Sequence, residues 1–295
     1  MKLLEGGIPG GEAWRTGTLA LLLTALDCDS LPAVVTCHSD VIRKRMLKPM
    51  HAVLARRVLH RVPFIHVPTE AHIENSGILP EFAEKIRAIP FIIDVDAMRR
   101  RDDGPLSIAL RKWAGDSALA VFVGRLVYYK GIDVLLDALS RTRRLSLVVV
   151  GDGPLRDSLK KRAAGLGITD RVRWLGTVGD DDVVAALSAG DFLALPSVAR
   201  SEAFGLIQVE AMAAGLPVVS TRLGTSVEVV NIDGKSGLVV RPNDPAELAQ
   251  AMQTLAEDAS LRRRLAAGAL TRAEDFAEPR LIGQYRQLYA DARAA

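Results

Sequence analysis

The sequence predicts an α/β protein built on doubly wound parallel sheets. Short apolar runs of strand length alternate with amphipathic helical patterns, and several of the runs end at a glycine. Strands that are separated by helices need crossover connections, which give parallel strands with helices on both faces of the sheet. The 295 residues are 49% hydrophobic and 25% charged, which suits a soluble chain of two globular domains.

The C-terminal two thirds carries this alternation most clearly. Strands are expected at residues 119–123, 145–150, 172–175, 192–196, 218–220 and 237–240. Helices are expected at residues 132–139, 155–166, 181–189, 206–214 and 245–255. Ligands of such sheets bind beyond the carboxyl ends of the strands. The segments after the first, second and fourth of these strands are therefore expected to converge on one site.

The N-terminal third has fewer elements. It predicts strands at residues 33–36, 64–68 and 86–90 and a long basic helix at 41–62, while residues 101–117 are interpreted as a linker. The helical segment is rich in Lys and Arg and contains no acid between Arg43 and Arg61. Such a helix suits an anionic membrane surface, and a solvated face of a soluble domain is an equal alternative.

Composition excludes several classes of function. The net charge of +3 gives no general signature of nucleic-acid binding. Two cysteines, Cys28 and Cys37, form no disulfide framework and no metal-ligand pattern, as in a cytoplasmic protein. The apolar run at residues 19–26 is too short to cross a bilayer and lacks the flanks of a signal peptide. We therefore expect a cytoplasmic protein.

Two cations follow the first strand of the C-terminal part. Arg125 comes directly after Gly124, and Lys130 precedes Gly131 and a predicted helix. Cations at a strand end can neutralise a diphosphate without a metal, although a pair of solvated loop charges is an equal alternative. Residues 151–154, Gly-Asp-Gly-Pro, lack the third glycine of a dinucleotide fingerprint and predict a tight turn.

The segment 201–210 contains two carboxylates eight positions apart. Glu202 is expected at the end of a loop and Glu210 about one turn into the following helix. The N–H groups of a first helical turn have no partner within the helix, so they can bind ligand oxygens. Ionised carboxylates accept short hydrogen bonds from hydroxyl groups, which suits a sugar.

Three other polar residues have weaker signals. His38 ends the best N-terminal strand, but an isolated histidine is more often structural, and no second histidine stands at metal-ligand spacing. For Asp152 and Asp191, capping or turn formation is favoured over a catalytic role.

Taken in order, these motifs resemble the retaining glycosyltransferases of family 4, which have a GT-B fold of two Rossmann-like domains. The resemblance runs from about Pro32 to the C-terminus and is dense over residues 121–240. The Glu-x7-Glu motif, including its Phe-Gly step, matches Glu202 to Glu210. The Gly-Arg…Lys-Gly phosphate site matches Gly124, Arg125, Lys130 and Gly131, and the acceptor-side His motif matches His38. Further matches include the turn at 151–154 and the small-residue run at 213–218.

The resemblance implies a role for each site residue. Arg125 and Lys130, beside Gly124, would bind the donor diphosphate and Glu210 the ribose. Glu202 would hold the sugar hydroxyls together with the backbone N–H groups of Phe204, Gly205 and Leu206. His38 would lie near the sugar and the leaving group. The family uses no metal or other cofactor, and its retaining transfer is usually described as front-face departure and attack through an oxocarbenium-like state.

The resemblance also implies a domain division and a substrate class. It gives a partial acceptor-side domain at 1–104, a donor-binding domain at 105–275, and a C-terminal helix at 276–295 that crosses back to the first domain. Only 37 residues precede His38, so a truncated N-terminal domain is expected. The expected function is transfer of a hexose, with GDP-mannose as the donor, to a lipid-linked or polysaccharide acceptor, at the cytoplasmic face of the membrane.

Two alternatives stay open. A nucleotide-sugar-binding remnant or partner subunit would keep the C-terminal site without turnover. A GT-B epimerase ranks lower because it would not need the Glu202–Glu210 spacing.

Overall fold

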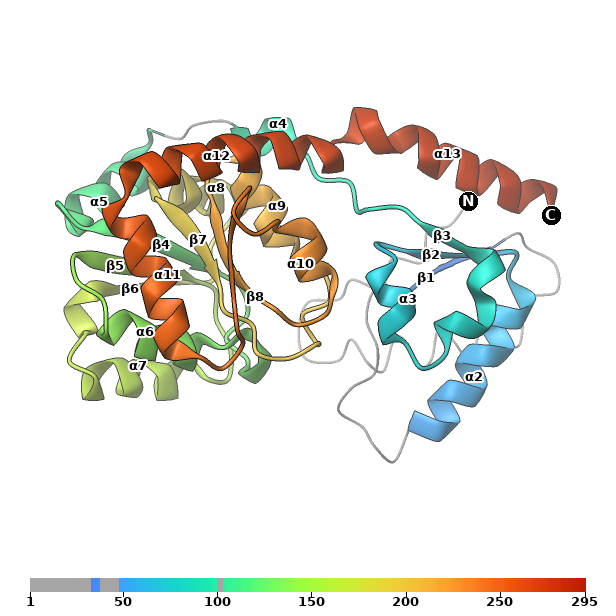
Figure 1. Ribbon diagram of the computed structural model, residues 1–295, viewed down its shortest axis with the longest axis horizontal. Coiled ribbons are helices and arrows are strands. Elements are labelled where there is room, and N and C mark those ends of the chain that lie inside the picture. Colours follow the sequence, from blue (N-terminus) through green and yellow to red (C-terminus); the bar gives the residue numbers. More distant parts are fainter. Residues whose placement is uncertain (1–32, 38–47, 100–102) are drawn as a thin grey trace. The chain divides into compact units, whose positions relative to one another are not determined.

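The computed structural model describes residues 33–37, 48–99 and 103–295, and it divides the chain into two compact units. The first comprises Met1–Ile89 with Gly283–Ala295, and the second is Pro90–Ile282. Within the described residues, both units contain a parallel sheet with helices, as the sequence predicts (Figure 1). Cys28, His38 and residues 38–47, which include part of the predicted basic helix, lie outside the described residues.

The first unit contains a three-stranded parallel sheet of order β1-β2-β3: β1 (Val34–Thr36), β2 (Phe64–Val67) and β3 (Ile86–Ala88). The helices are α2 (Lys48–Arg61), α3 (Ala71–Asn75) and the C-terminal part of α13 (Glu278–Ala294). A small core joins α2 to the strands through Val58, Ile65 and Phe82. The three predicted N-terminal strands are confirmed to within two residues.

The second unit is built on a six-stranded parallel sheet of order β6-β5-β4-β7-β8-β9. Its strands are β4 (Ala118–Val123), β5 (Leu145–Val150), β6 (Val172–Gly176), β7 (Phe192–Leu195), β8 (Val218–Thr221) and β9 (Gly237–Val240). β4, β5 and β7 are wholly or almost wholly buried, because parallel strands with helices on both faces meet no solvent. All six strands agree with the sequence prediction.

Alternate residues of the strands pack against different helices (Figure 1). On one face, Phe122 and its neighbours pack against α6 (Ile132–Ser140), α7 (Arg156–Gly165) and α11 (Pro245–Glu257). On the other face, Val121 and its neighbours pack against α5 (Pro105–Ala114), α8 (Asp180–Ala189) and α9 (Leu206–Ala213). The helices α4 (Val95–Arg99), α10 (Ser226–Val230) and α12 (Ala259–Ala273) complete the unit.

Two predictions need correction. The segment 101–117 is not a linker, because α5 occupies most of it: Pro105 fits the first helical position, and Leu110 and Ala114 are buried against the sheet. The boundary between the units also falls at Pro90, earlier than residue 104. The reason is that Phe91, Ile93 and Val95 pack into the core of the second unit.

Candidate functional site

The strand order of the second unit reverses between β4 and β7. The chain moves outward from β4 through β5 to β6, then returns beside β4 and continues outward through β8 to β9. In open parallel sheets, ligands bind beyond the carboxyl ends of the two strands at this switch point. The loops that leave these two ends are residues 124–131 and 196–205, which hold six of the nine predicted site residues.

The loops at these strand ends are in direct contact. The Val198 N–H donates to the Tyr129 carbonyl at 2.8 Å, and the Leu126 N–H donates to the Asp152 carbonyl at 2.9 Å. A side chain at Gly131, whose φ is +65°, would place its Cβ 2.1 Å from the Pro196 carbonyl oxygen. The glycine is therefore required where the two loops touch. The predicted convergence of the three strand ends is confirmed.

A buried ion pair joins the two loops. Lys130 Nζ lies 2.6 Å from Glu202 Oε2, and the side chains are only 12% and 8% exposed. The Ser197 hydroxyl donates to the same carboxylate oxygen at 2.8 Å. Glu202 is thus held through Oε2 by two donors, and Oε1 makes no hydrogen bond within the described residues. The resemblance implies separate roles for Lys130 and Glu202, and their pairing was not predicted.

Arg125 is the second cation of the site. It is exposed, and within the described part of the chain its guanidinium makes no ion pair or hydrogen bond. Lys130 is partly neutralised by Glu202, so Arg125 is the cation of this pair with its charge uncompensated. Gly124 lies beside Lys130, since a Cβ built there would be 3.6 Å from Lys130 Nζ.

Glu210 lies one turn into α9, as predicted, and is half-buried. Burial raises the pKa of its carboxyl group, and the nearby charge of Asp180 raises it further. Among the described residues no group donates a hydrogen bond to it. A carboxylate in this setting gains from any ligand that brings a hydroxyl donor.

The backbone between the two glutamates presents unpaired donors. Gly205 precedes α9 in a left-handed conformation, with φ of +71°, and the first turn of the helix begins at Leu206. Within the described residues, no acceptor pairs with the N–H groups of Phe204, Gly205 or Leu206. These donors can bind ligand oxygens at the positive end of the helix.

Residues 109–272, more than half of the chain, match the family Glycosyl transferases group 1. The chain belongs to this family.

Relatives of this group 1 chain add detail. It is 38% identical to the D-rhamnosyltransferase WbpZ of Pseudomonas aeruginosa over 83% of its own length and 62% of that protein. It is 32% identical to the O-antigen chain mannosyltransferase C of Escherichia coli over 87% of its length and 68% of that protein. The chain thus spans about three fifths to two thirds of the length of these relatives.

Solved structures show the same fold. The Anabaena protein HepE, in complex with UDP and glucose, matches with a TM-score of 0.79 and 22% identity over 95% of this chain and 75% of that one. Sucrose-phosphate synthase from Thermosynechococcus elongatus matches with a TM-score of 0.80 and 22% identity, over 95% of this chain and 72% of that one. These likenesses establish a GT-B-like fold for this group 1 chain.

Several polar residues of this group 1 chain have structural roles. Asp152 accepts from the Gly153 N–H and from Arg156 in the turn before α7, and Asp191 accepts from the Leu119 N–H and from Arg111, long-range bonds that neither cap a helix nor form a turn. His66 was not among the predicted site residues. Its buried ring lies within hydrogen-bond distance of the Ile89 carbonyl at 2.7 Å and of the Tyr285 hydroxyl at 3.2 Å. Burial raises the pKa of Tyr285 to about 12.

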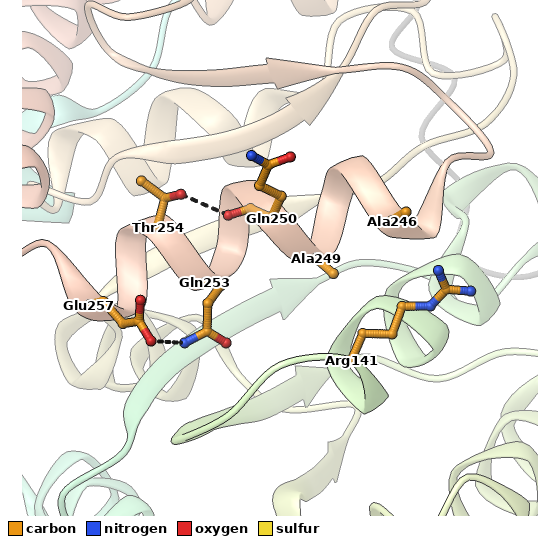
Figure 2. A pocket seen from close by; sticks show the side chains of 7 residues that line it. All are labelled: Arg141, Ala246, Ala249, Gln250, Gln253, Thr254 and Glu257. Atoms are coloured by element: carbon orange, nitrogen blue, oxygen red, sulfur yellow. Dashed lines mark hydrogen bonds between the residues drawn. The ribbon is translucent and has the colours of Figure 1, made fainter.

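A shallow groove of about 350 Å³ lies elsewhere in the second unit, between α11 and the end of α6 (Figure 2). Its Gln253 amide is already bonded to Glu257 and to the Arg143 carbonyl. The groove contains none of the predicted site residues; it is lined by Arg141, Ala246, Ala249, Gln250, Gln253, Thr254 and Glu257. Among the described residues, no group of three or more His, Cys, Asp or Glu side chains is placed to hold a metal ion.

Proposed function

We propose that this chain transfers a hexosyl group from a nucleoside-diphosphate sugar to a glycan acceptor, with retention of the anomeric configuration. The observation that carries the proposal is the set of groups at the β4–β7 switch point: two cations, two carboxylates and a row of unpaired backbone donors. These groups match three of the four parts of such a donor, which are the diphosphate, the ribose and the sugar, and leave the base unassigned. Among the relatives, a rhamnosyltransferase and an O-antigen mannosyltransferase favour a mannose-type sugar. GDP-mannose is the donor that we propose.

Arg125 and Lys130 would act on the leaving group. Departure of the sugar leaves negative charge on the diphosphate, and cations fixed beside it stabilise that charge without a metal. Because Glu202 already offsets part of the Lys130 charge, Arg125 would supply the larger share of the attraction. Glu202 Oε1 and the amides of Phe204, Gly205 and Leu206 would bind the sugar hydroxyls, and Glu210 the ribose. His38 would lie near the sugar and the leaving group.

The acceptor would be a lipid-linked or polysaccharide chain, and the protein a cytoplasmic one that binds the membrane surface. In α2, which has no acidic side chain, Val53, Arg57 and Arg61 are exposed, and Val53 is 63% exposed. Basic residues beside an apolar one favour anionic lipid. Within the described residues, no helix has the length and hydropathy needed to cross a bilayer. Vesicles that contain anionic lipid should bind the protein at low salt and release it at high salt; salt-insensitive or absent binding would contradict the proposal.

Binding of a nucleotide sugar without turnover is the second candidate, because the site residues at the switch point belong to the second unit alone. Transfer and hydrolysis assays with lipid-linked acceptors separate the two. Binding with neither transfer nor hydrolysis would leave only the second candidate.

The donor assignment is tested by a thermal-shift screen with GDP-, UDP- and ADP-sugars. A ligand that binds only the native state raises the melting temperature by mass action. Arg125→Ala should abolish the shift, whereas Arg263→Ala, at an exposed and unpaired arginine on α12, should leave it unchanged. Equal shifts for both variants would refute the phosphate role of Arg125.

A further inference from the structure

Three consecutive carbonyl groups of the loop before α9 are bonded to the protein interior. The Thr225 hydroxyl donates to the Glu202 carbonyl at 3.0 Å, and the Ser226 N–H donates to the Ala203 carbonyl at 3.1 Å. The Gln208 side-chain amide donates to the Phe204 carbonyl at 3.0 Å. Thr225 and Gln208 are both buried, at 7% and 0% exposure.

These bonds fix the direction of the three following N–H groups. In a trans peptide, the C=O of one residue and the N–H of the next point in opposite directions. When the carbonyls of Glu202, Ala203 and Phe204 point toward their donors, the N–H groups of Ala203, Phe204 and Gly205 point away from them. Within the described residues no acceptor pairs with these three N–H groups.

Gln208 is costly for a residue with a packing role alone. Its side chain is completely buried, and its Oε1 atom has no hydrogen-bond partner among the described residues. A buried polar atom without a partner destabilises the fold, which offsets the stability that the Gln208 amide gains from its bond to the Phe204 carbonyl. Gly205 leaves room for this amide, because a Cβ there would lie 2.8 Å from Gln208 Nε2.

We infer that Thr225 and Gln208 are positioning residues of the site. They hold the carbonyls of Glu202 and Phe204 inward, so that the N–H groups of Ala203 and Gly205 are turned in advance toward the oxygens of a nucleoside-diphosphate sugar. This inference rests on the proposed function, which supplies the ligand. It adds one residue on α9 and the residue that caps α10, neither of which touches the ligand itself.

The test compares matched isosteric variants. Thr225→Val removes the hydroxyl that donates to Glu202, and Gln208→Met removes the amide that donates to Phe204. Thr142→Val is the control: Thr142 is 4% exposed, donates to the Leu139 carbonyl at 2.8 Å, and lies at the end of α6, away from the two loops. For each protein, the affinities for GDP and GDP-mannose are measured by calorimetry, and the melting temperature is measured without ligand.

Thr225→Val and Gln208→Met should each weaken GDP-mannose binding by roughly three- to tenfold, the effect of one or two hydrogen bonds. Gln208→Met removes the orphan Oε1 but also leaves the Phe204 carbonyl without its donor, so the two effects oppose each other and the melting temperature should stay close to that of the wild type. Thr142→Val should lower the melting temperature without a change in affinity.

If the wild type binds GDP-mannose and neither Thr225→Val nor Gln208→Met changes the affinity, the inference is overturned and the proposed function stands. A wild type that binds no sugar nucleotide of any base would overturn the proposed function and this inference with it. If Thr225→Val does not fold, Gln208→Met decides alone.

Discussion

Removal of the Lys130 ammonium should destabilise the second unit, because it leaves the Glu202 carboxylate buried without its cation. Breaking a buried ion pair by deleting one partner costs about 3–5 kcal/mol. The geometry places Lys130→Met at the lower end of this range. The Ser197 hydroxyl still donates to the same carboxylate oxygen, which retains part of the stabilisation. We expect a loss of about 3 kcal/mol, equivalent to roughly 6–12 °C in melting temperature for a unit of this size.

A double-mutant cycle tests the physical reason. In Lys130→Met with Glu202→Gln, no charge is left buried, and the new amide can still pair with Ser197. The double variant should therefore recover to within about 1 kcal/mol of the wild type. Its affinity for a nucleoside-diphosphate sugar should not recover, since both proposed ligand-binding groups are gone.

The assay is urea unfolding followed by tryptophan fluorescence. Trp113 and Trp174 belong to the second unit, and the third tryptophan, Trp14, is replaced by Phe in every protein compared, so that the signal reports on the unit that contains the pair. Arg241→Met is the control, because Arg241 pairs with Glu247 at the surface and is 72% exposed. Such pairs contribute about 0.2–1 kcal/mol. The reasoning is refuted if Lys130→Met loses no more than this control, or if the double variant loses the sum of both single changes.

Three further outcomes are expected. Glu210→Gln should raise the melting temperature at neutral pH and weaken donor binding. Burial and Asp180 raise the native pKa of this carboxyl, so the native state gains stability as the pH falls through that pKa. A lower melting temperature of the variant would contradict this. Asp191→Ala should cost about 2 kcal/mol by urea unfolding, because it leaves the Leu119 N–H unpaired, with donor affinity unchanged; a loss of affinity would contradict its structural role. Burial lowers the pKa of His66 in the native state, so as the pH falls the unfolded chain binds a proton before the native state does, and the free energy of unfolding should decrease below about pH 6.5. Urea midpoints of the wild type and His66→Gln that fall in parallel would refute this.

The architecture of the second unit could be predicted because local patterns were enough to define it. Each strand is a short apolar run with a helix before and after it, which fixes a parallel sheet without knowledge of any contact. The carboxyl ends of parallel strands share one edge, so Arg125, Lys130 and Glu202 could be placed together although 77 positions separate the first from the last. This rule identified the site before any distance was known.

The predictions failed where a helix has no clear hydrophobic period, or where a turn signal was preferred to a helical one. In α5, the preceding Asp-Asp-Gly-Pro outweighed the spacing of Leu106, Leu110 and Trp113, which repeats at helical intervals and packs against the sheet. The helix α12 was not predicted, because its buried positions Leu265, Ala269 and Ala273 are mostly small and stand among arginines. The Lys130–Glu202 pair depends on side-chain geometry that no one-dimensional pattern contains.

The distribution of unsatisfied groups supports the choice of site independently of any resemblance. At the amino ends of the strands, Asp191 is saturated by a backbone N–H and by Arg111, as a structural acid should be. At the carboxyl ends, beside the exposed cation Arg125, the described residues include a half-buried carboxyl of raised pKa at Glu210 and an orphan amide oxygen at Gln208. Unsatisfied polar groups reduce stability, so selection for a stable fold alone would eliminate them, and groups kept by chance would be spread over the molecule. Their concentration at one edge of the sheet is what a site requires when its ligand supplies the missing partners.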